Sequence, residues 1–246
     1  MAFSPRVSPR LAGPVSPPCS DAGGVPSMPA LPPESLLFFK GSDATANAWV
    51  DRLQGLSVPA SGTPIVAADA AFGGRVVAQS ANVGNYGWRG TGLSGLPASG
   101  TNPYTLSYVR FRAFTASGNQ TVLGLRSAAL AFGAWVRYNG ATSALECSAP
   151  DNDVAVAAAS PYSSTAPVVL ELWSSGTHAL SRVNGVSATI ANAGSLGANQ
   201  TTLAFGMADN GTNRADVSHA VHWMCSSKPS DAAITVVTTW LAAYYG

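Results

Sequence analysis

The pattern of hydrophobic and polar positions predicts strands along most of the chain. In ALAFGAWVRY, the side chains of Leu130, Phe132, Ala134, Val136 and Tyr138 share one parity, as in a half-buried strand. The segments PVVLELW and TLAFGM alternate in the same way. Glycine, asparagine and serine clusters interrupt these runs about every ten residues, a spacing typical of a β-sandwich or jelly roll.

Two further segments refine this pattern. In YTLSYVRFRAF, Leu106 and Tyr108 share one parity whereas Val109 and Phe111 share the other, so either both faces are covered or a bulge intervenes. In ALSRVNGVSATI, the pair Asn184-Gly185 separates two alternating runs. Both residues tolerate the positive φ of a type I′ turn, which predicts a hairpin.

Only the C-terminal segment SDAAITVVTTWLAAYYG has the period of a helix. Ser230 is a suitable N-cap, and Asp231 in the first turn suits the helix dipole. Ile234, Val237 and Leu241 follow at three- and four-residue spacing and predict one buried stripe.

The first 35 residues form a different kind of segment. Nine of the first 33 residues are proline, of 17 in the chain, so this stretch lacks the donors for a helix or a central strand. We expect residues 1–35 to form an extended arm that docks on another chain, and residues 36–246 to form one domain that does not need it. A chain starting at Ser35 would then keep its thermal midpoint. The residues expected to anchor the arm to its partner are Phe3, Arg6, Val7, Arg10, Leu11 and Val15.

Composition limits the partners of the protein. The formal net charge is +1, and the four charges of residues 1–35 sum to zero, so we expect no nucleic-acid partner. Charged residues make up only 10% of the chain, which suits packing into an oligomer or larger assembly. Three scattered cysteines do not make a disulfide framework, and no apolar run predicts a membrane span or a signal peptide.

From about residue 36 onward, the chain resembles the concanavalin A-like, laminin-G-type jelly rolls, especially those of bacteriophage structural proteins. The likeness rests on the order of NAWVDRLQGLSVPASGTPIVA, YTLSYVRFRAFTASGNQTVLGL, VVLELWSSGTHALSRVNGVSATI and the ending from LAFGMADNG to LAAYYG. It implies an all-β fold: a two-sheet jelly-roll sandwich with a short C-terminal helix. It also implies a virion setting, with the product made in the host cytoplasm.

Related jelly rolls include glycosidases, which need two carboxyl groups close together. VVLELWSS offers only Glu171, and Asp151 and Asp153 lie in a predicted turn. We therefore expect no catalytic residues and no enzymatic activity.

No metal or other cofactor is expected. On a regular strand, His219 and His222 of SHAVHWMC would point to opposite faces, and His219 and Cys225 would lie ~20 Å apart. The segment ADNGTNRAD supplies oxygen ligands suited to calcium but is equally a plain turn sequence. Its candidate calcium ligands are Asp209, Asn210, Asn213 and Asp216.

A glycine-rich segment contains the candidate glycan contacts. Tyr86, Trp88 and Arg89 stand among six glycines between residues 82 and 104. An aromatic face there could stack on a sugar ring while Arg89 hydrogen-bonds its hydroxyl groups. Alternatively, Trp88 plugs one end of the sandwich or contacts a neighbouring subunit.

Two functions fit these features. The first is a non-enzymatic virion structural protein, such as a capsid decoration or head-fibre component anchored to other virion proteins through the arm. The alternative is a carbohydrate-binding adhesin or receptor-binding module. The arm favours the first, because a polyproline-like segment loses little entropy on docking.

Overall fold

The computed structural model describes residues 26–81, 87–114, 119–127, 132–139, 144–148, 166–174, 178–184, 186–191, 196, 198–208, 212 and 214–246. All statements about the structure below concern these residues. The first 25 residues, which include all six predicted arm anchors, lie outside the described part.

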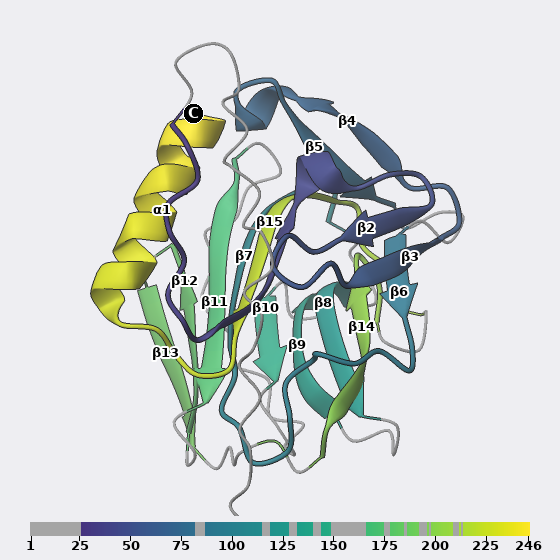
Figure 1. Ribbon diagram of the computed structural model, residues 1–246. Coiled ribbons are helices and arrows are strands. Elements are labelled where there is room, and N and C mark those ends of the chain that lie inside the picture. Colours follow the sequence, from purple (N-terminus) through teal and green to yellow (C-terminus); the bar gives the residue numbers. More distant parts are fainter. Residues whose placement is uncertain are drawn as a thin grey trace, which may run out of the picture.

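Two antiparallel sheets make up most of the described chain (Figure 1). The first, called sheet A here, has the order β13-β12-β11-β7-β15-β5-β4, and β1 also pairs with β15. Its strands are β1 (Ser35–Lys40), β4 (Ile65–Asp69), β5 (Arg75–Ser80), β7 (Tyr104–Phe111), β11 (Val168–Ser174), β12 (His178–Val183), β13 (Val186–Ala191) and β15 (Val217–Cys225).

The second sheet, called sheet C here, has the order β10-β9-β8-β14-β6-β3-β2. Its strands are β2 (Ala48–Val50), β3 (Ser57–Ser61), β6 (Gly87–Gly90), β8 (Asn119–Ser127), β9 (Phe132–Asn139), β10 (Ala144–Ser148) and β14 (Gln200–Phe205). Two single-turn 3-10 helices, η1 (Gly41–Asp43) and η2 (Ala70–Phe72), lie between strands.

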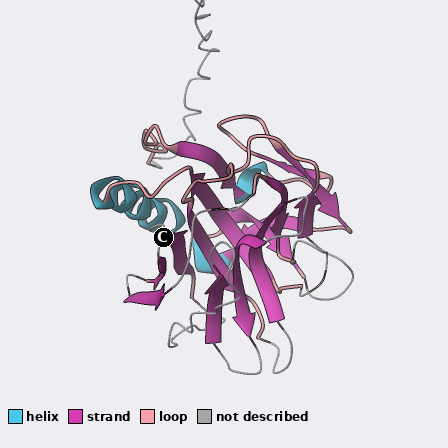
Figure 2. Ribbon diagram, turned by 90° about the horizontal axis from the view of Figure 1, so that it is seen from below, coloured by secondary structure: helices cyan, strands magenta, loops and turns pink. Residues whose placement is uncertain are grey.

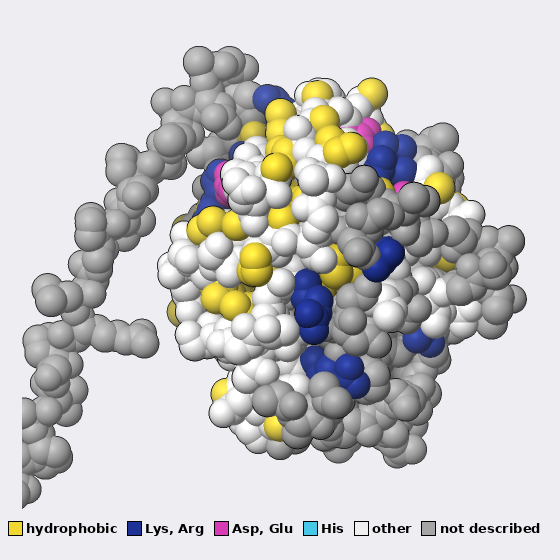
Figure 3. Space-filling model, turned by 90° about the vertical axis from the view of Figure 1, so that its right-hand side faces the viewer, with side chains coloured by type: hydrophobic (Ala, Val, Ile, Leu, Met, Phe, Trp, Pro, Cys, Tyr) yellow, Lys and Arg dark blue, Asp and Glu magenta, His cyan; other side chains and the backbone are white. Residues whose placement is uncertain are grey.

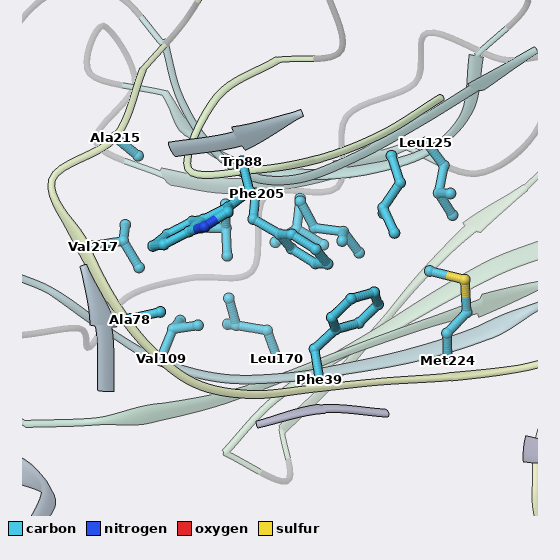
Figure 4. Packing of buried hydrophobic residues seen from close by; sticks show 14 of the residues in the cluster. Phe39, Ala78, Trp88, Val109, Leu125, Leu170, Phe205, Ala215, Val217 and Met224 are labelled. Carbon is cyan, nitrogen blue, oxygen red and sulfur yellow. The ribbon is translucent and has the colours of Figure 1, made fainter. Parts of the chain in front are cut away.

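A first hydrophobic core fills the space between the two sheets. Figure 4 shows Trp88, Phe205 and Leu125 of sheet C pointing toward Phe39 and Val109 of sheet A. The alternating residues predicted from the sequence supply this core, because one parity of each strand faces the opposite sheet.

A second core lies between sheet A and the C-terminal helix α1 (Asp231–Tyr245) (Figures 1 and 2). The Ser230 hydroxyl caps the helix by accepting a hydrogen bond from the Ala233 N–H at 3.2 Å. The predicted stripe of Ile234, Val237 and Leu241 is buried against the sheet. This helix also explains β7, where both faces are covered: Leu106 faces the helix and Val109 faces the other sheet.

The last part of the predicted arm packs on its own domain. Figure 1 shows the chain from residue 26 running beside α1, and the Trp240 indole N–H donates to the Pro26 carbonyl at 3.1 Å. Met28 and Leu31 are partly buried against the second core. Residues 26–34 therefore act as a strap over the helix.

The predicted fold class is confirmed: the chain forms a two-sheet sandwich with one short C-terminal helix. The predicted hairpin is also present, because β12 and β13 pair antiparallel with Val183 opposite Val186, and Asn184 has a φ of 46°. None of the described helices has the length and apolarity to cross a membrane.

The strap yields a first prediction, which differs from the expectation for a chain starting at Ser35. Compared with a chain that starts at Pro26, a chain that starts at Ser35 loses the burial of Met28 and Leu31 and the hydrogen bond from Trp240. We expect its free energy of unfolding to fall by about 2–3 kcal/mol. Urea unfolding of both chains measures this difference, and equal midpoints would show that the strap contributes nothing.

Candidate functional site

The candidate glycan contacts separate in the structure. Tyr86 lies outside the described residues, and Trp88 is fully buried in the first core. The Trp88 ring lies 5.1 Å from that of Trp49, and its indole N–H donates to the Thr45 carbonyl at 3.3 Å. The prediction that Trp88 contacts a glycan is wrong, because Trp88 occupies a position on β6 whose side chain points between the two sheets.

Arg89 points the other way, toward the outer face of sheet C. Its neighbour Trp88 faces the core, and successive residues of a strand face opposite sides. Arg126 follows the core residue Leu125 on β8, and Arg137 lies between two core residues of β9. All three arginines are half-buried, so part of each reaches solvent.

The strand register shows how these arginines are spaced. Arg89 lies opposite Ala204, Ala204 lies opposite Gly124, and Gly124 lies opposite Trp135, which together form one row across four strands. Arg126 lies in a neighbouring row opposite Thr202, and Arg137 lies on the other side of the Gly124 row opposite Thr121. The three arginines thus surround a patch with the small residues Ala204 and Gly124 at its centre. We call them the arginine triad.

The strands of sheet C are basic as a group. They contain the arginine triad and one acidic residue, Glu146, which lies opposite Arg137. Figure 3 views the molecule from the side of β6 and β14, and dark blue Lys and Arg side chains run down the middle of that face. Acidic side chains are seen there only in the upper part.

Glu171, the nearest catalytic candidate, lies on the helix side of sheet A and is only 3% exposed. The Tyr104 hydroxyl donates to one of its oxygens at 2.8 Å, and Arg182 pairs with the other at 3.5 Å. Burial beside this carboxylate raises the pKa of Tyr104. The guanidinium of Arg182 and the ammonium of Lys228 both lie over the Trp173 ring, at 5.5 and 5.3 Å. This cluster borders the second core, to which Tyr104 and Trp173 belong.

The prediction that the two histidines of β15, His219 and His222, point to opposite faces is wrong. A bulge at Ala220 inserts one residue between His219, paired with Val109, and Val221, paired with Tyr108. Both imidazoles therefore face the first core, whereas Cys225 faces the second.

The imidazoles form a buried hydrogen-bonded chain with two serines. His222 Nδ1 lies 2.8 Å from Ser107 Oγ, His222 Nε2 lies 2.9 Å from His219 Nδ1, and His219 Nε2 lies 2.9 Å from Ser80 Oγ. Ser80 donates in turn to the Ala215 carbonyl at 2.8 Å. With donation running from Ser107 to Ala215, both histidines are neutral and every ring nitrogen is bonded. Burial lowers the pKa of His222 to about 3, and burial together with His222 lowers that of His219 well below its ordinary value.

Within the described ranges, no three His, Cys, Asp or Glu side chains are grouped so that they could hold a metal ion. Of the calcium candidates, Asp209, Asn210 and Asn213 lie outside the described residues. Asp216 lies just before β15, where its carbonyl accepts a hydrogen bond from the Arg112 backbone N–H at 2.8 Å. The expectation that no metal binds therefore stays a prediction, and calcium binding by this segment stays the alternative.

Comparison with known proteins supports the fold. No protein-family model and no curated protein matches the sequence. Among solved structures, a Trypanosoma rangeli sialidase matches 87% of this chain and 33% of its own, with a TM-score of 0.54 and 14% identity. A GH54 α-L-arabinofuranosidase matches 81% of this chain and 51% of its own, with a TM-score of 0.59 and 11% identity.

A third similar structure is the binding domain of botulinum neurotoxin DC in complex with SialylT. It matches 85% of this chain and 52% of its own, with a TM-score of 0.55 and 10% identity. This chain therefore spans between a third and about half of each of these proteins, and the likeness concerns the β-sandwich fold.

The comparison corrects the expectation of a non-enzymatic protein. That expectation rested on a single glutamate in VVLELWSS and on the resemblance to structural jelly rolls. The sialidase and the arabinofuranosidase are enzymes whose structures contain a sandwich of this kind. The fold thus occurs in enzymes, and a lone glutamate on one strand is not a sound reason to exclude activity.

The histidine chain predicts acid lability. Because both folded-state pKa values lie below the ordinary 6.5, the unfolded chain binds these protons first and stability falls as the pH drops from 6.5 toward about 3. From pH 6.5 to 5.0 we expect a loss of about 2 kcal/mol for each histidine. The raised pKa of Asp51 opposes this loss, and the lowered pKa of Asp69 adds to it only at lower pH.

Urea unfolding between pH 7 and 5 measures this loss, and the variant His222→Gln should show about half of the pH dependence. NMR of the native imidazoles provides a measurement that needs no variant. A histidine of this pair that titrates near pH 6.5 in the folded protein would contradict the prediction.

The Glu171 cluster gives a prediction about stability. Glu171→Gln keeps an acceptor for the Tyr104 hydroxyl, whereas Glu171→Leu leaves that hydroxyl buried without its partner. We expect a loss in the free energy of unfolding of about 1 kcal/mol for the first and about 3 kcal/mol for the second. Chemical denaturation at pH 7 checks the order, which the reverse ranking would refute.

Proposed function

We propose that this chain is a carbohydrate-binding β-sandwich domain and that the saccharide binds the outer face of sheet C. The proposal takes up the alternative reading of the sequence. The observation that carries it is the arginine triad, which reaches solvent on the sheet face away from α1.

The similar structures support carbohydrate as the ligand class. A sialidase, an arabinofuranosidase and a toxin binding domain in complex with SialylT differ in activity, yet each is described by its relation to sugars. A shared fold does not by itself transfer a function. The choice of surface therefore has to come from this chain.

The two sheets offer different outer surfaces. The outer face of sheet A is covered by α1 and by the strap, and its apolar side chains belong to the second core. No described helix packs on the outer face of sheet C, and three half-buried arginines lie there, whereas Thr121 and Thr202 of the same face are buried. Guanidinium groups offer several hydrogen-bond donors, which the hydroxyl oxygens of a saccharide can accept.

Assembly into a virion through residues 1–35 stays a prediction from the sequence. A glycan-binding domain that is also a subunit of such an assembly would combine both readings.

A glycan array with neutral and acidic saccharides tests the proposal. We expect saturable binding to at least one structural class, competed by the free saccharide and lost on thermal unfolding. In NMR titration with the selected saccharide, the backbone amides of β6, β8 and β9 should shift. An array without binding would refute the function, and shifts confined to sheet A would refute the proposed surface.

A further inference from the structure

The strap, residues 26–34, lies beside α1 on the side of sheet A that faces away from sheet C (Figure 1). It rests on Trp240, Ser226 and the apolar side chains of the second core, and we call this surface the strap site. We infer that the strap site recognises proline-rich segments in the polyproline II conformation. Its partner is such a segment of another protein, and the strap is an internal competitor for it. This interaction is independent of carbohydrate binding, which concerns the opposite sheet.

The sequence of the strap, PSMPALPPE, repeats every three residues. Proline occurs at positions 26, 29 and 32, and the large apolar residues Met28 and Leu31 each come directly before a proline. A polyproline II helix has three residues per turn, so the prolines form one row along it and the two apolar residues form another. The repeat unit is thus an apolar residue, a proline and one variable residue.

Exposure along the strap follows the same period. Met28 and Leu31 are partly buried and pack against the second core. The exposed residues are Pro26, Ser27, Ala30 and Pro33. From residue 27 onward, every third residue therefore faces solvent while the apolar row faces the domain, as expected for a polyproline II segment bound along one side.

The domain holds the strap through the contacts that bind proline-rich segments. A polyproline II backbone has no internal hydrogen bonds, so its carbonyl groups accept from donors on the surface below, and aromatic side chains line that surface. The Trp240 indole N–H donates to the Pro26 carbonyl at 3.1 Å, and the Ser226 backbone N–H donates to the Glu34 carbonyl at 2.9 Å. The Trp240 ring lies 6.2 Å from that of Phe38. The strap site thus combines donors with an aromatic surface.

The strap can leave this surface without disturbing the sandwich. None of the residues 26–34 is buried. The strap joins β1 through one turn, in which the Ser35 N–H donates to the Pro32 carbonyl at 3.0 Å. Opening this turn frees the strap site while β1 stays paired with β15 from Leu37 onward.

The chemistry of the site favours another protein over a second copy of this chain. The strap of a second copy makes the same contacts as the chain's own strap, whose attachment gives it an effective concentration in the millimolar range. Exchange between copies therefore gains nothing from these contacts. A partner segment with more repeats of the unit adds contacts that the strap lacks, and it displaces the strap for that reason.

Two peptides taken from this sequence test the recognition. Residues 26–33, PSMPALPP, and residues 11–18, LAGPVSPP, share prolines at their fourth, seventh and eighth positions. The second peptide has Gly13 and Ser16 where the first has Met28 and Leu31, so it is a matched control. The receptor is the full chain with Met28→Ser and Leu31→Ser, whose own strap competes only weakly.

Calorimetry should show at least tenfold tighter binding of the 26–33 peptide than of the 11–18 peptide, because only the first buries two apolar side chains. The parent chain should bind the 26–33 peptide at least tenfold more weakly than the variant does, because its own strap fills the site. Equal binding of the two peptides would overturn the inference. So would the absence of binding by a variant that keeps the circular dichroism spectrum of the parent chain.

The parent chain allows a measurement that needs no change in the strap. In NMR, the Trp240 indole N–H signal should shift progressively as the 26–33 peptide reaches several millimolar, where it matches the effective concentration of the strap. Trp240→Phe should weaken binding of the peptide about fivefold. The matched control is Trp49→Phe, since Trp49 is another buried indole that donates to a backbone carbonyl, that of Lys40 at 2.9 Å, in the first core. An indole signal that does not shift would overturn the inference.

A longer peptide tests the choice of partner. The tandem peptide PSMPALPPMPALPP should bind the parent chain at least tenfold more tightly than the 26–33 peptide does, because its added repeats make further apolar contacts. Equal binding of the two would overturn the proposal of a longer partner segment. Self-association of the parent chain that the 26–33 peptide reverses would assign the site to a second copy and would also overturn this choice.

Discussion

The bulge at Ala220 in the central strand β15 determines how the two layers of this domain meet. Every residue of β15 is buried, and the strand pairs with β7 on one side and with β1 and β5 on the other. The inserted residue turns both His219 and His222 into the space between the sheets. There they bond to each other and to Ser107 and Ser80, which lie on the neighbouring strands β7 and β5. A polar chain inside an apolar core is favourable only when every member is satisfied, and here the register of three strands satisfies it.

Sheet A has a supporting role on both of its faces. Its inner face forms the first core with sheet C, and its outer face forms the second core with α1 and the strap. The charged residues of this sheet follow the same division, since Arg110 and Arg182 pair with Asp69 and Glu171. Among the described residues, those of sheet C contribute to the first core and not to the second. Its outer face can therefore carry side chains that serve a ligand, which is why the proposed site lies there.

The comparison with enzymes changes how Glu171 should be understood. A glutamate on a strand of a jelly roll invites a catalytic reading, and the absence of a second one invites the opposite conclusion. In the structure, its oxygens are held by Tyr104 and Arg182 beside the Trp173 ring. The residue binds β7, β11 and β12 together, and this role neither requires nor excludes activity elsewhere in the chain.

The sequence alone determined the sandwich, the hairpin at Asn184 and the C-terminal helix with its Ser230 cap, because these follow from local periodicity and turn chemistry. It also showed that Leu106 and Val109 differ in parity, and it left open whether both faces of that strand are covered or a bulge intervenes. Only the tertiary structure decided which side of a strand faces outward and which residues meet across strands. A single inserted residue reversed the parity of the histidines, and the core took Trp88 away from the surface. Strand register placed Arg89 of β6 on the same face as Arg126 and Arg137 of the consecutive strands β8 and β9. Register and bulges depend on contacts between strands that are far apart in the chain, and no local pattern records them.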